Sequence, residues 1–335
     1  FACNADKRNM STRNRKGKRG PPDKNGAPEK PGPEAQKGAQ SQGTDHDMQR
    51  VQAVTTKRIL LRVTFILLTL GIVALLSSQG DQSGLTTFVK QDETVRKRIL
   101  DVSCSKDYKK YNRFEGCTPR RCGRGVMDGL VGQDEAGQLL RIAKRGLALG
   151  GSNGGASILD LHSGALSKGD TFINLYEMVK ANKHKTVFSE DDFSLYRKVK
   201  NRIRAAIAEE FGIQPDRLHL THPTFFSRMT TRPAKTVHDE YWHLHIDKET
   251  YGSFDYTSLL YLTDYGHDFT GGRFVFVDKE ANSTVEPRTG RVSFFTSGSE
   301  NLHFVEKVVS GTRFAITVSF SCDPKHAIAD PHVKL

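Results

Sequence analysis

Three signatures that would assign a chain to a familiar class are missing or misplaced in these 335 residues. No Cys-x-x-Cys pair is present, so a structural zinc site is a weaker alternative for the cysteines than disulfide bonding. The glycine-rich run at residues 150–155 lacks the strand-turn-helix context of a phosphate-binding loop. The Asp-x-Asp sequence at residues 45–47 lies in an N-terminal tail and not on an α/β domain, which argues against a glycosyltransferase.

Large apolar residues are scarce in residues 1–58, which are rich in Gly, Pro, Lys, Gln and Asn. This tail holds 13 Lys and Arg against 6 Asp and Glu, so +7 of the formal net charge of +12 lies there. Such a segment cannot bury enough surface to offset its conformational entropy, and we expect disorder. The basic excess is therefore a property of the tail and does not indicate that the folded part binds nucleic acid.

Residues 59–78 form one long apolar run whose single charge, Arg62, lies near its N-terminal end. About 20 apolar residues cross the hydrocarbon core as a helix, so the run predicts a transmembrane signal-anchor rather than a cleaved signal peptide. Lys57 and Arg58 precede the run and Asp81 follows it. By the positive-inside rule the tail is cytoplasmic and the rest is lumenal or extracellular, a type II topology in the secretory pathway.

Two features beyond the apolar run fit an oxidising compartment. Four cysteines lie there, at Cys104, Cys117, Cys122 and Cys322. They allow three disulfide pairings, and the sequence does not choose among them. Three of them fall in residues 79–130, which we interpret as a cysteine-containing stem. The sequon that starts at Asn282 predicts N-glycosylation.

The periodicity changes from helical to extended near Arg217. Apolar residues at helical spacing predict helices over 131–150 and from a cap at Asp191 or Asp192 to Phe211-Gly212. Short strands separated by glycine-containing turns are predicted at 218–226, 243–247, 257–262, 273–277, 291–296, 301–305 and 313–320. This order predicts an α+β, mainly β fold in residues 131–335: a double-stranded β-helix (jelly-roll) barrel buttressed by N-terminal helices and preceded by one transmembrane helix.

The strongest chemical signal is His245 and Asp247, followed 56 residues later by His303. Residues i and i+2 of a strand share a face, so His245 and Asp247 can both point into the barrel. Two imidazoles and one carboxylate occupy one face of an octahedral metal and leave the other face open, which is typical of non-haem iron(II) sites. His243 shares that face, and we interpret it as a supporting or structural histidine, with ligation the alternative.

Arg313 follows His303 by ten residues. A guanidinium can hold a carboxylate with two parallel hydrogen bonds, so metal and arginine together suggest a keto acid bound at both ends. Thr317 lies four residues further and shares the face of Arg313. The alternate residues Phe314, Ile316 and Val318 are expected to pack on the opposite side.

With these motifs the region after residue 100 resembles the Fe(II)- and 2-oxoglutarate-dependent dioxygenases of the prolyl 4-hydroxylase type. The resemblance is carried by residues 104–125, 150–166, 238–262 and 291–306. It implies that His245, Asp247 and His303 bind iron. Ascorbate, which commonly re-reduces the iron in this family, is implied as a further cofactor.

The resemblance also implies that Arg313 pairs with the distal carboxylate of 2-oxoglutarate, and that Tyr261 and Thr317 hydrogen-bond the same group. Collagen-type prolyl hydroxylases have Lys where this chain has Arg313, whereas lysyl hydroxylases and some other prolyl hydroxylases have Arg. The implied activity is a membrane-anchored hydroxylase that uses O2 and releases succinate and CO2, with a protein Pro or Lys as a candidate substrate. A non-catalytic metal-binding jelly-roll interaction module is the alternative, and neither the substrate nor the oligomeric state is indicated.

Overall fold

The computed structural model describes residues 60–71, 84–110, 113–181 and 187–332, and the chain divides into two units, Phe1–Ala74 and Leu75–Leu335. The predicted tail at 1–58 lies outside the described residues, as do the ends of the predicted span at 59–78. Residues 60–71 form a helix. None of the helices in the described ranges is both long and apolar enough to cross a membrane.

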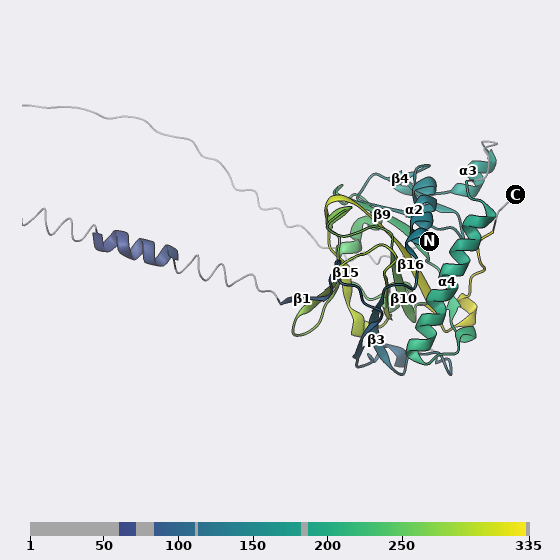
Figure 1. Cartoon of the computed structure of the whole chain (residues 1–335), viewed down its shortest axis with the longest axis horizontal. Helices are drawn as coiled ribbons and strands as arrows, with labels where there is room; N and C mark the ends of the chain where they lie inside the picture. Colours follow the sequence, from purple (N-terminus) through teal and green to yellow (C-terminus); the bar gives the residue numbers. More distant parts are fainter. Residues whose placement is uncertain (1–59, 72–83, 111–112, 182–186, 333–335) are drawn as a thin grey trace, which may run out of the picture. The chain divides into compact units, whose positions relative to one another are not determined.

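Two β-sheets form the second unit (Figure 1). The larger has the strand order β2 (Arg98–Val102), β3 (Cys122–Met127), β14 (Val292–Thr296), β10 (Tyr256–Tyr261), β16 (Val308–Ser321), β9 (Phe225–Thr230), β5 (Ala156–Leu159), β6 (Ala165–Gly169) and β4 (Gly151–Ser152). Onto it pair β7 (Thr171–Asn174), β8 (His219–Leu220) and β11 (Phe269–Gly271). The smaller has the order β1 (Leu85–Val89), β13 (Asn282–Val285), β12 (Phe274–Phe276) and β15 (His303–Val305). The pairs are antiparallel except β1 with β13 and β4 with β6, so the predicted mainly β class is confirmed.

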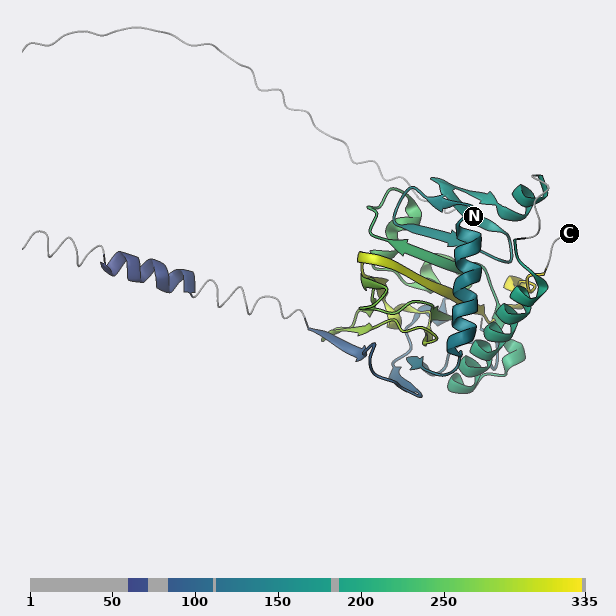
Figure 2. The same ribbon diagram turned by 45° about the horizontal axis from the view of Figure 1, so that its top comes forward.

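Two long helices, α2 (Gln133–Leu147) and α4 (Glu190–Phe211), cover one face of the large sheet (Figure 2). The apolar faces of these helices and the strand residues that point toward them form one buried cluster. The N-cap of α4 is Ser189, two or three residues before the predicted caps, because the Ser189 side chain accepts the Asp192 N–H and the Asp192 carboxylate accepts the Ser189 N–H. It ends at Gly212, whose φ of 66° suits a left-handed cap. α3 (Leu175–Ala181) is short.

The other face of the large sheet packs against the small sheet through a second apolar cluster. β16 shows how one strand serves both clusters. Phe314, Ile316 and Val318 belong to the helix-facing cluster, as the alternation predicts, while Ala315 belongs to the cluster between the sheets. Arg313 has the parity of Ala315 and therefore points to the side where the sheets face each other.

The segment predicted as a stem, 79–130, is built into the sheets. β1 pairs with β13, and β3, the second strand along the large sheet's path, pairs with β2 and β14. Two disulfides fix it, Cys104–Cys122 and Cys117–Cys322, the second joining residues 205 apart in sequence. No boundary therefore separates the described part of this segment from the following domain.

Candidate metal centre

His245 and His303 lie opposite each other on adjacent backbone segments. They form an isolated antiparallel bridge with reciprocal hydrogen bonds, His245 N to His303 O at 3.0 Å and His303 N to His245 O at 3.2 Å. Their ring centroids are 4.3 Å apart. Two residues distant in sequence are thus brought together by backbone pairing rather than by side-chain contacts alone.

Asp247 completes the cluster. Its Oδ1 lies 3.8 Å from His245 Nε2 and 3.7 Å from His303 Nε2, and the three ligand atoms lie within 4.8 Å of one another. Among the described residues this is the one group of three or more His, Cys, Asp or Glu side chains with such convergence. The structure thus brings together the three residues that the sequence predicted as metal ligands, and their donor set suits a divalent transition metal.

The prediction of a strand over 243–247 is wrong, however. Only His245 makes a bridge, and Asp247 is the first residue of the short helix α5 (Asp247–Tyr251). The chain turns there because the Lys248 N–H donates to Ser297 O at 2.9 Å instead of continuing a ladder. The carboxylate still reaches the imidazoles, but through a helical turn and not through the i, i+2 geometry of a strand.

Backbone carbonyls set the tautomer of both histidines. His245 Nδ1 lies 2.9 Å from His243 O, and His303 Nδ1 lies 2.8 Å from Asn301 O. A carbonyl only accepts, so each Nδ1 carries the proton and each Nε2 keeps its lone pair for a metal. Burial lowers the pKa of His303 to about 4, which keeps this imidazole neutral near pH 7.

The Asp247 carboxylate is also oriented. Its Oδ2 accepts the Thr257 hydroxyl at 2.6 Å, and Thr257 Oγ1 lies 2.9 Å from Ser297 Oγ. With Oδ2 engaged, Oδ1 is the oxygen directed at the two imidazoles. Lys248, the next residue, makes a buried ion pair with Asp255 at 2.8 Å, which anchors α5.

His243 supports the site through its backbone. Its side chain is exposed and its ring lies 6.1 Å from that of Trp242, while its carbonyl orients His245. In the parts of the chain that the structure covers, its imidazole is not a member of the converging group. The expectation of a supporting role rather than ligation therefore agrees with the geometry.

Three phenylalanines surround His303. Phe274 stacks on its ring at 4.9 Å, Phe295 meets it edge-on at 4.9 Å, and Phe276 lies at 6.4 Å. All three are buried. They keep water away from one side of the cluster, which strengthens electrostatic interactions at that side.

Arg313 is fully buried, with 0% of its surface exposed. Its Nη1 contacts Met229 Sδ at 3.5 Å, and its Cζ lies 5.5 Å from the centre of the Tyr261 ring. Within the described residues, Nε and Nη2 have no hydrogen-bond partner, and burial lowers the pKa of this guanidinium. An unpaired buried cation is costly, so these atoms fit a carboxylate supplied by a small molecule.

Tyr261 and Thr317 lie at different places relative to Arg313. The Tyr261 hydroxyl is buried 3.0 Å from Ser293 Oγ, and its ring lies beside Arg313. Thr317 pairs with Leu259 on the same inner side, but four residues of strand separate it from Arg313 by roughly 13 Å of backbone. Along β16, Thr317 therefore lies between Arg313 and Ser319, the residue that pairs with Thr257 beside the metal cluster.

Asp239 is a site-supporting residue that the sequence reasoning missed. Burial would raise the pKa of this carboxyl, but N–H donors from Lys235, Ala156 and Thr236 outweigh burial and lower the pKa. It holds the start of η3 (Val237–Trp242), which leads to His245, against β5. A Cβ on Gly154 would lie 1.7 Å from Asp239 Oδ2, so the glycine-rich run at 150–155 makes room for this carboxylate.

The sequence model of the 2OG-Fe(II) oxygenase superfamily matches residues 227–321, which contain the histidines, Asp247, Tyr261, Arg313 and Thr317. This fold and site define the class, and the chain is a 2-oxoglutarate-dependent dioxygenase.

Curated relatives place it within that class. It is 61% identical over 251 residues to "2-oxoglutarate and iron-dependent oxygenase domain-containing protein 3" of Xenopus tropicalis, covering 75% of this chain and 79% of the relative. The protein of the same name from Rattus norvegicus is 57% identical over 278 residues, covering 82% and 88%. The chain belongs to this family of 2OG-Fe(II) oxygenases. Human "Prolyl 3-hydroxylase 2" is 34% identical over 116 residues, covering 34% of this chain and 15% of the relative.

Proposed function

We propose that His245, Asp247 and His303 bind Fe(II) and that Arg313 binds the distal carboxylate of 2-oxoglutarate. The observation that carries this is the fully buried Arg313 guanidinium, whose Nε and Nη2 lack a partner among the described residues, on the same inner side of the sheets as the His-Asp-His cluster. Both cofactors are implied by the family. We infer that the two sheets form a double-stranded β-helix around this site.

Each residue then has a physical task. Asp247 Oδ1 and the Nε2 atoms of His245 and His303 would hold the metal, a donor set suited to iron(II). Arg313 holds the far end of the keto acid, so that its keto acid group is presented to the metal. Thr317 lies along β16 between Arg313 and the metal cluster, and it is suited to contact the carbon chain or the distal carboxylate of 2-oxoglutarate. Bound iron would supply the chemistry that converts O2 and 2-oxoglutarate into succinate, CO2 and a hydroxylated product.

For the substrate we propose a prolyl or lysyl side chain of a protein. The local similarity to prolyl 3-hydroxylase 2 supports protein hydroxylation, and Arg313 in place of Lys makes a collagen-type prolyl 4-hydroxylase less favoured. Leu244, which is 58% exposed and next to His245, is an apolar residue near the metal cluster that a peptide could contact.

We further propose a type II signal-anchor at 59–78, a lumenal or extracellular catalytic unit, glycosylation at Asn282 and a requirement for ascorbate. The apolar run, the flanking charges and the two disulfides support the topology. Asn282 begins strand β13 at the paired edge with β1 and is partly exposed. Protection of the catalytic unit from protease in sealed microsomes tests the topology. A decrease in apparent mass on glycosidase treatment, absent in Asn282→Gln, tests the glycosylation.

The activity is tested with the full chain in detergent, supplied with Fe(II), 2-oxoglutarate, ascorbate, O2 and Pro- or Lys-containing peptides. Succinate should form with iron and disappear in His245→Ala and Arg313→Met. Because turnover without the true substrate can be slow, 2-oxoglutarate binding is measured in the same samples. Absence of both succinate and metal-dependent 2-oxoglutarate binding would refute the proposal and favour a binding module. Any shortened protein should begin before Leu85, since β1 and β2 belong to the sheets.

A further inference from the structure

The turn that precedes His303 is held by a segment about 190 residues earlier in the chain. The first N–H groups of a helical turn lack partners inside the turn. For η4 (Ser299–Asn301), Tyr108 Oη accepts the Gly298 N–H at 2.8 Å and Asp107 Oδ2 accepts the Ser299 N–H at 2.7 Å. The side chains of residues 107 and 108 therefore cap η4 from outside.

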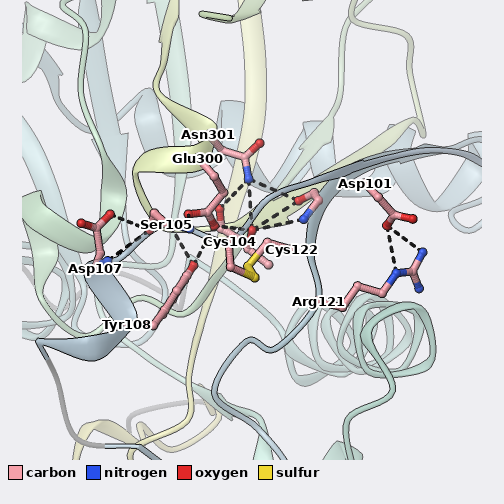
Figure 3. The surroundings of a disulfide bond; sticks show 12 residues. Asp101, Cys104, Ser105, Asp107, Tyr108, Arg121, Cys122, Glu300 and Asn301 are labelled. Atoms are coloured by element: carbon pink, nitrogen blue, oxygen red, sulfur yellow. Dashed lines mark hydrogen bonds and ion pairs between the residues drawn. A yellow bond between two sulfur atoms is a disulfide. The ribbon is translucent and has the colours of Figure 1, made fainter.

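Glu300, within η4, is the centre of the same contacts (Figure 3). Its Oε1 accepts the Tyr108 hydroxyl at 2.9 Å and the Thr296 hydroxyl at 2.5 Å, and its Oε2 accepts the Ser105 N–H at 3.2 Å. Burial, with the neighbouring Glu300, raises the pKa of Tyr108 well above its usual value. The phenol thus stays protonated and can donate to Glu300 while accepting from Gly298.

Gly298 shows how closely these groups pack. Its φ of −79° is ordinary, so no conformational reason demands glycine there. A Cβ would, however, lie 2.4 Å from Glu300 Oε2 and 2.7 Å from Ser105 Oγ. Gly298 is therefore required by the close packing of the Glu300 contacts.

Asn301 connects this arrangement to the histidine. Its carbonyl accepts from His303 Nδ1, the bond that leaves Nε2 free for a metal. Its Nδ2 donates to Thr296 O at 2.9 Å and to Gly123 O at 3.3 Å. A displaced η4 would move the Asn301 carbonyl and with it the orientation of the His303 ring.

The disulfide Cys104–Cys122 makes the supporting segment a closed loop. Ser105 directly follows one of its cysteines and Gly123 directly follows the other. Both ends of the support are therefore adjacent to one covalent cross-link, as Figure 3 shows around the two sulfur atoms.

We propose that Tyr108 and Glu300 are positioning residues for His303 and that they set the metal affinity of the centre. They act through the η4 backbone and the Asn301 carbonyl, without touching the metal. This inference rests on the proposed function, because it concerns the same ligand set, and it extends that set to the N-terminal segment that the sequence suggested to be a stem.

The test titrates the full chain with Co(II) and follows metal binding by the visible absorption of the bound ion. Glu300→Ala should weaken binding about 10- to 100-fold and alter the spectrum, since partners of metal-bound histidines typically contribute that much. Glu300→Gln should lie between it and the wild type. Its amide oxygen still accepts from Tyr108 and Thr296, but its nitrogen cannot accept from Ser105. Tyr108→Phe should also weaken binding.

Tyr196→Phe is the matched control. It removes the hydroxyl of another buried tyrosine, which lies on α4 in the helix-facing cluster. This hydroxyl is 2.9 Å from His162 Nε2. Urea unfolding without metal should show similar losses in the two Tyr→Phe variants, while Tyr108→Phe alone changes Co(II) affinity. If Glu300→Ala does not fold, Glu300→Gln and Tyr108→Phe decide the question.

The outcomes separate the two claims. A wild-type protein that binds no Co(II) would overturn the proposed metal centre itself. A wild type that binds, with Glu300→Gln and Tyr108→Phe indistinguishable from Tyr196→Phe in affinity and spectrum, would overturn the positioning role and leave the metal centre standing.

Discussion

The His-Asp-His cluster and Arg313 lie on the same inner side of the sheets but differ in how their polar atoms are paired. Around the cluster, both Nδ1 atoms and Asp247 Oδ2 have partners within 2.9 Å. At Arg313, Nε and Nη2 have none in the described ranges of the chain. One end is fixed by the protein's own hydrogen bonds, whereas the other is a buried cation with two unpaired nitrogen atoms, for which we propose an anionic ligand.

The contrast with Arg291 supports this interpretation. Arg291 is equally buried, but its guanidinium is saturated by Asp128 and by the carbonyls of Lys90, Glu93 and Glu286. Complete pairing is the normal state of a buried arginine. Arg313 departs from it, which is expected where stability is given up for binding.

The largest effect is expected at the metal end. His245→Ala removes one of three ligands, so turnover should fall below detection and Co(II) binding should be lost. Chelation of the wild type should abolish succinate formation reversibly, with Fe(II) restoring it. If added Fe(II) restored succinate formation by His245→Ala to the wild-type rate, His245 would not be a metal ligand.

At the opposite end, Arg313→Met should raise the half-saturating concentration of 2-oxoglutarate more than about 100-fold, because two hydrogen bonds to a charged group are lost at about 1.5–3 kcal/mol each. It should also raise the unfolding free energy without co-substrate by about 1 kcal/mol or more, since an unpaired buried charge is removed.

Arg291→Met is the matched control, and it should lower the unfolding free energy by about 3–5 kcal/mol, because it leaves Asp128 unpaired. Urea unfolding and 2-oxoglutarate titration measure both effects. Equal destabilisation by the two substitutions would contradict the difference between the arginines.

Thr257→Val tests the orientation of Asp247. Loss of the hydroxyl that donates to Oδ2 should weaken metal binding about 10-fold or more. Thr263→Val is the control on the same side of the molecule as Arg313, where Thr263 Oγ1 accepts the Phe314 N–H at 2.9 Å. Its Co(II) affinity should stay at the wild-type value, and a parallel loss in both variants would argue against a specific role of Thr257.

The smallest effect is expected for Tyr261→Phe. Its hydroxyl would donate one hydrogen bond to the ligand carboxylate, and a bond to a charged group contributes about 1.5 kcal/mol or more, so the half-saturating 2-oxoglutarate concentration should rise about 10-fold, with metal affinity unchanged. Separate titrations of the two ligands check this. A larger effect on Co(II) binding than on 2-oxoglutarate binding would place Tyr261 at the wrong end.

Periodicity predicted the elements that depend on nearby residues. The helical spacing of Leu139, Ile142 and Ala143 places them in the core beneath α2, and the alternation along β16 separates Phe314 from Arg313 as expected. The N-cap of α4 is Ser189 and not Asp191 or Asp192. The Ser189 hydroxyl and the Asp192 carboxylate form a reciprocal capping box over four residues, and this box fixes the start of the helix.

Prediction was weaker where distant segments decide local structure. The pattern predicts an extended stretch at 243–247, yet only His245 makes a bridge, and a bond from Lys248 N to Ser297 O accompanies the start of α5 at Asp247. Residues 79–130 lack a long apolar pattern, and pairing with β13 and β14 makes strands of Leu85–Val89 and Cys122–Met127. The disulfide pairing also depended on this placement, since four cysteines permit three arrangements.

The sequence by itself determined the chemical types: two imidazoles, a carboxylate and an arginine in an order typical of 2-oxoglutarate-dependent dioxygenases. Only the tertiary structure decided which of their atoms are free. Backbone carbonyls from His243 and Asn301 leave each Nε2 available, and burial without partners leaves the Arg313 guanidinium able to bind an anion. The physical reason is that residue types define what a side chain can bind, whereas pairing and burial define what it has left to bind with.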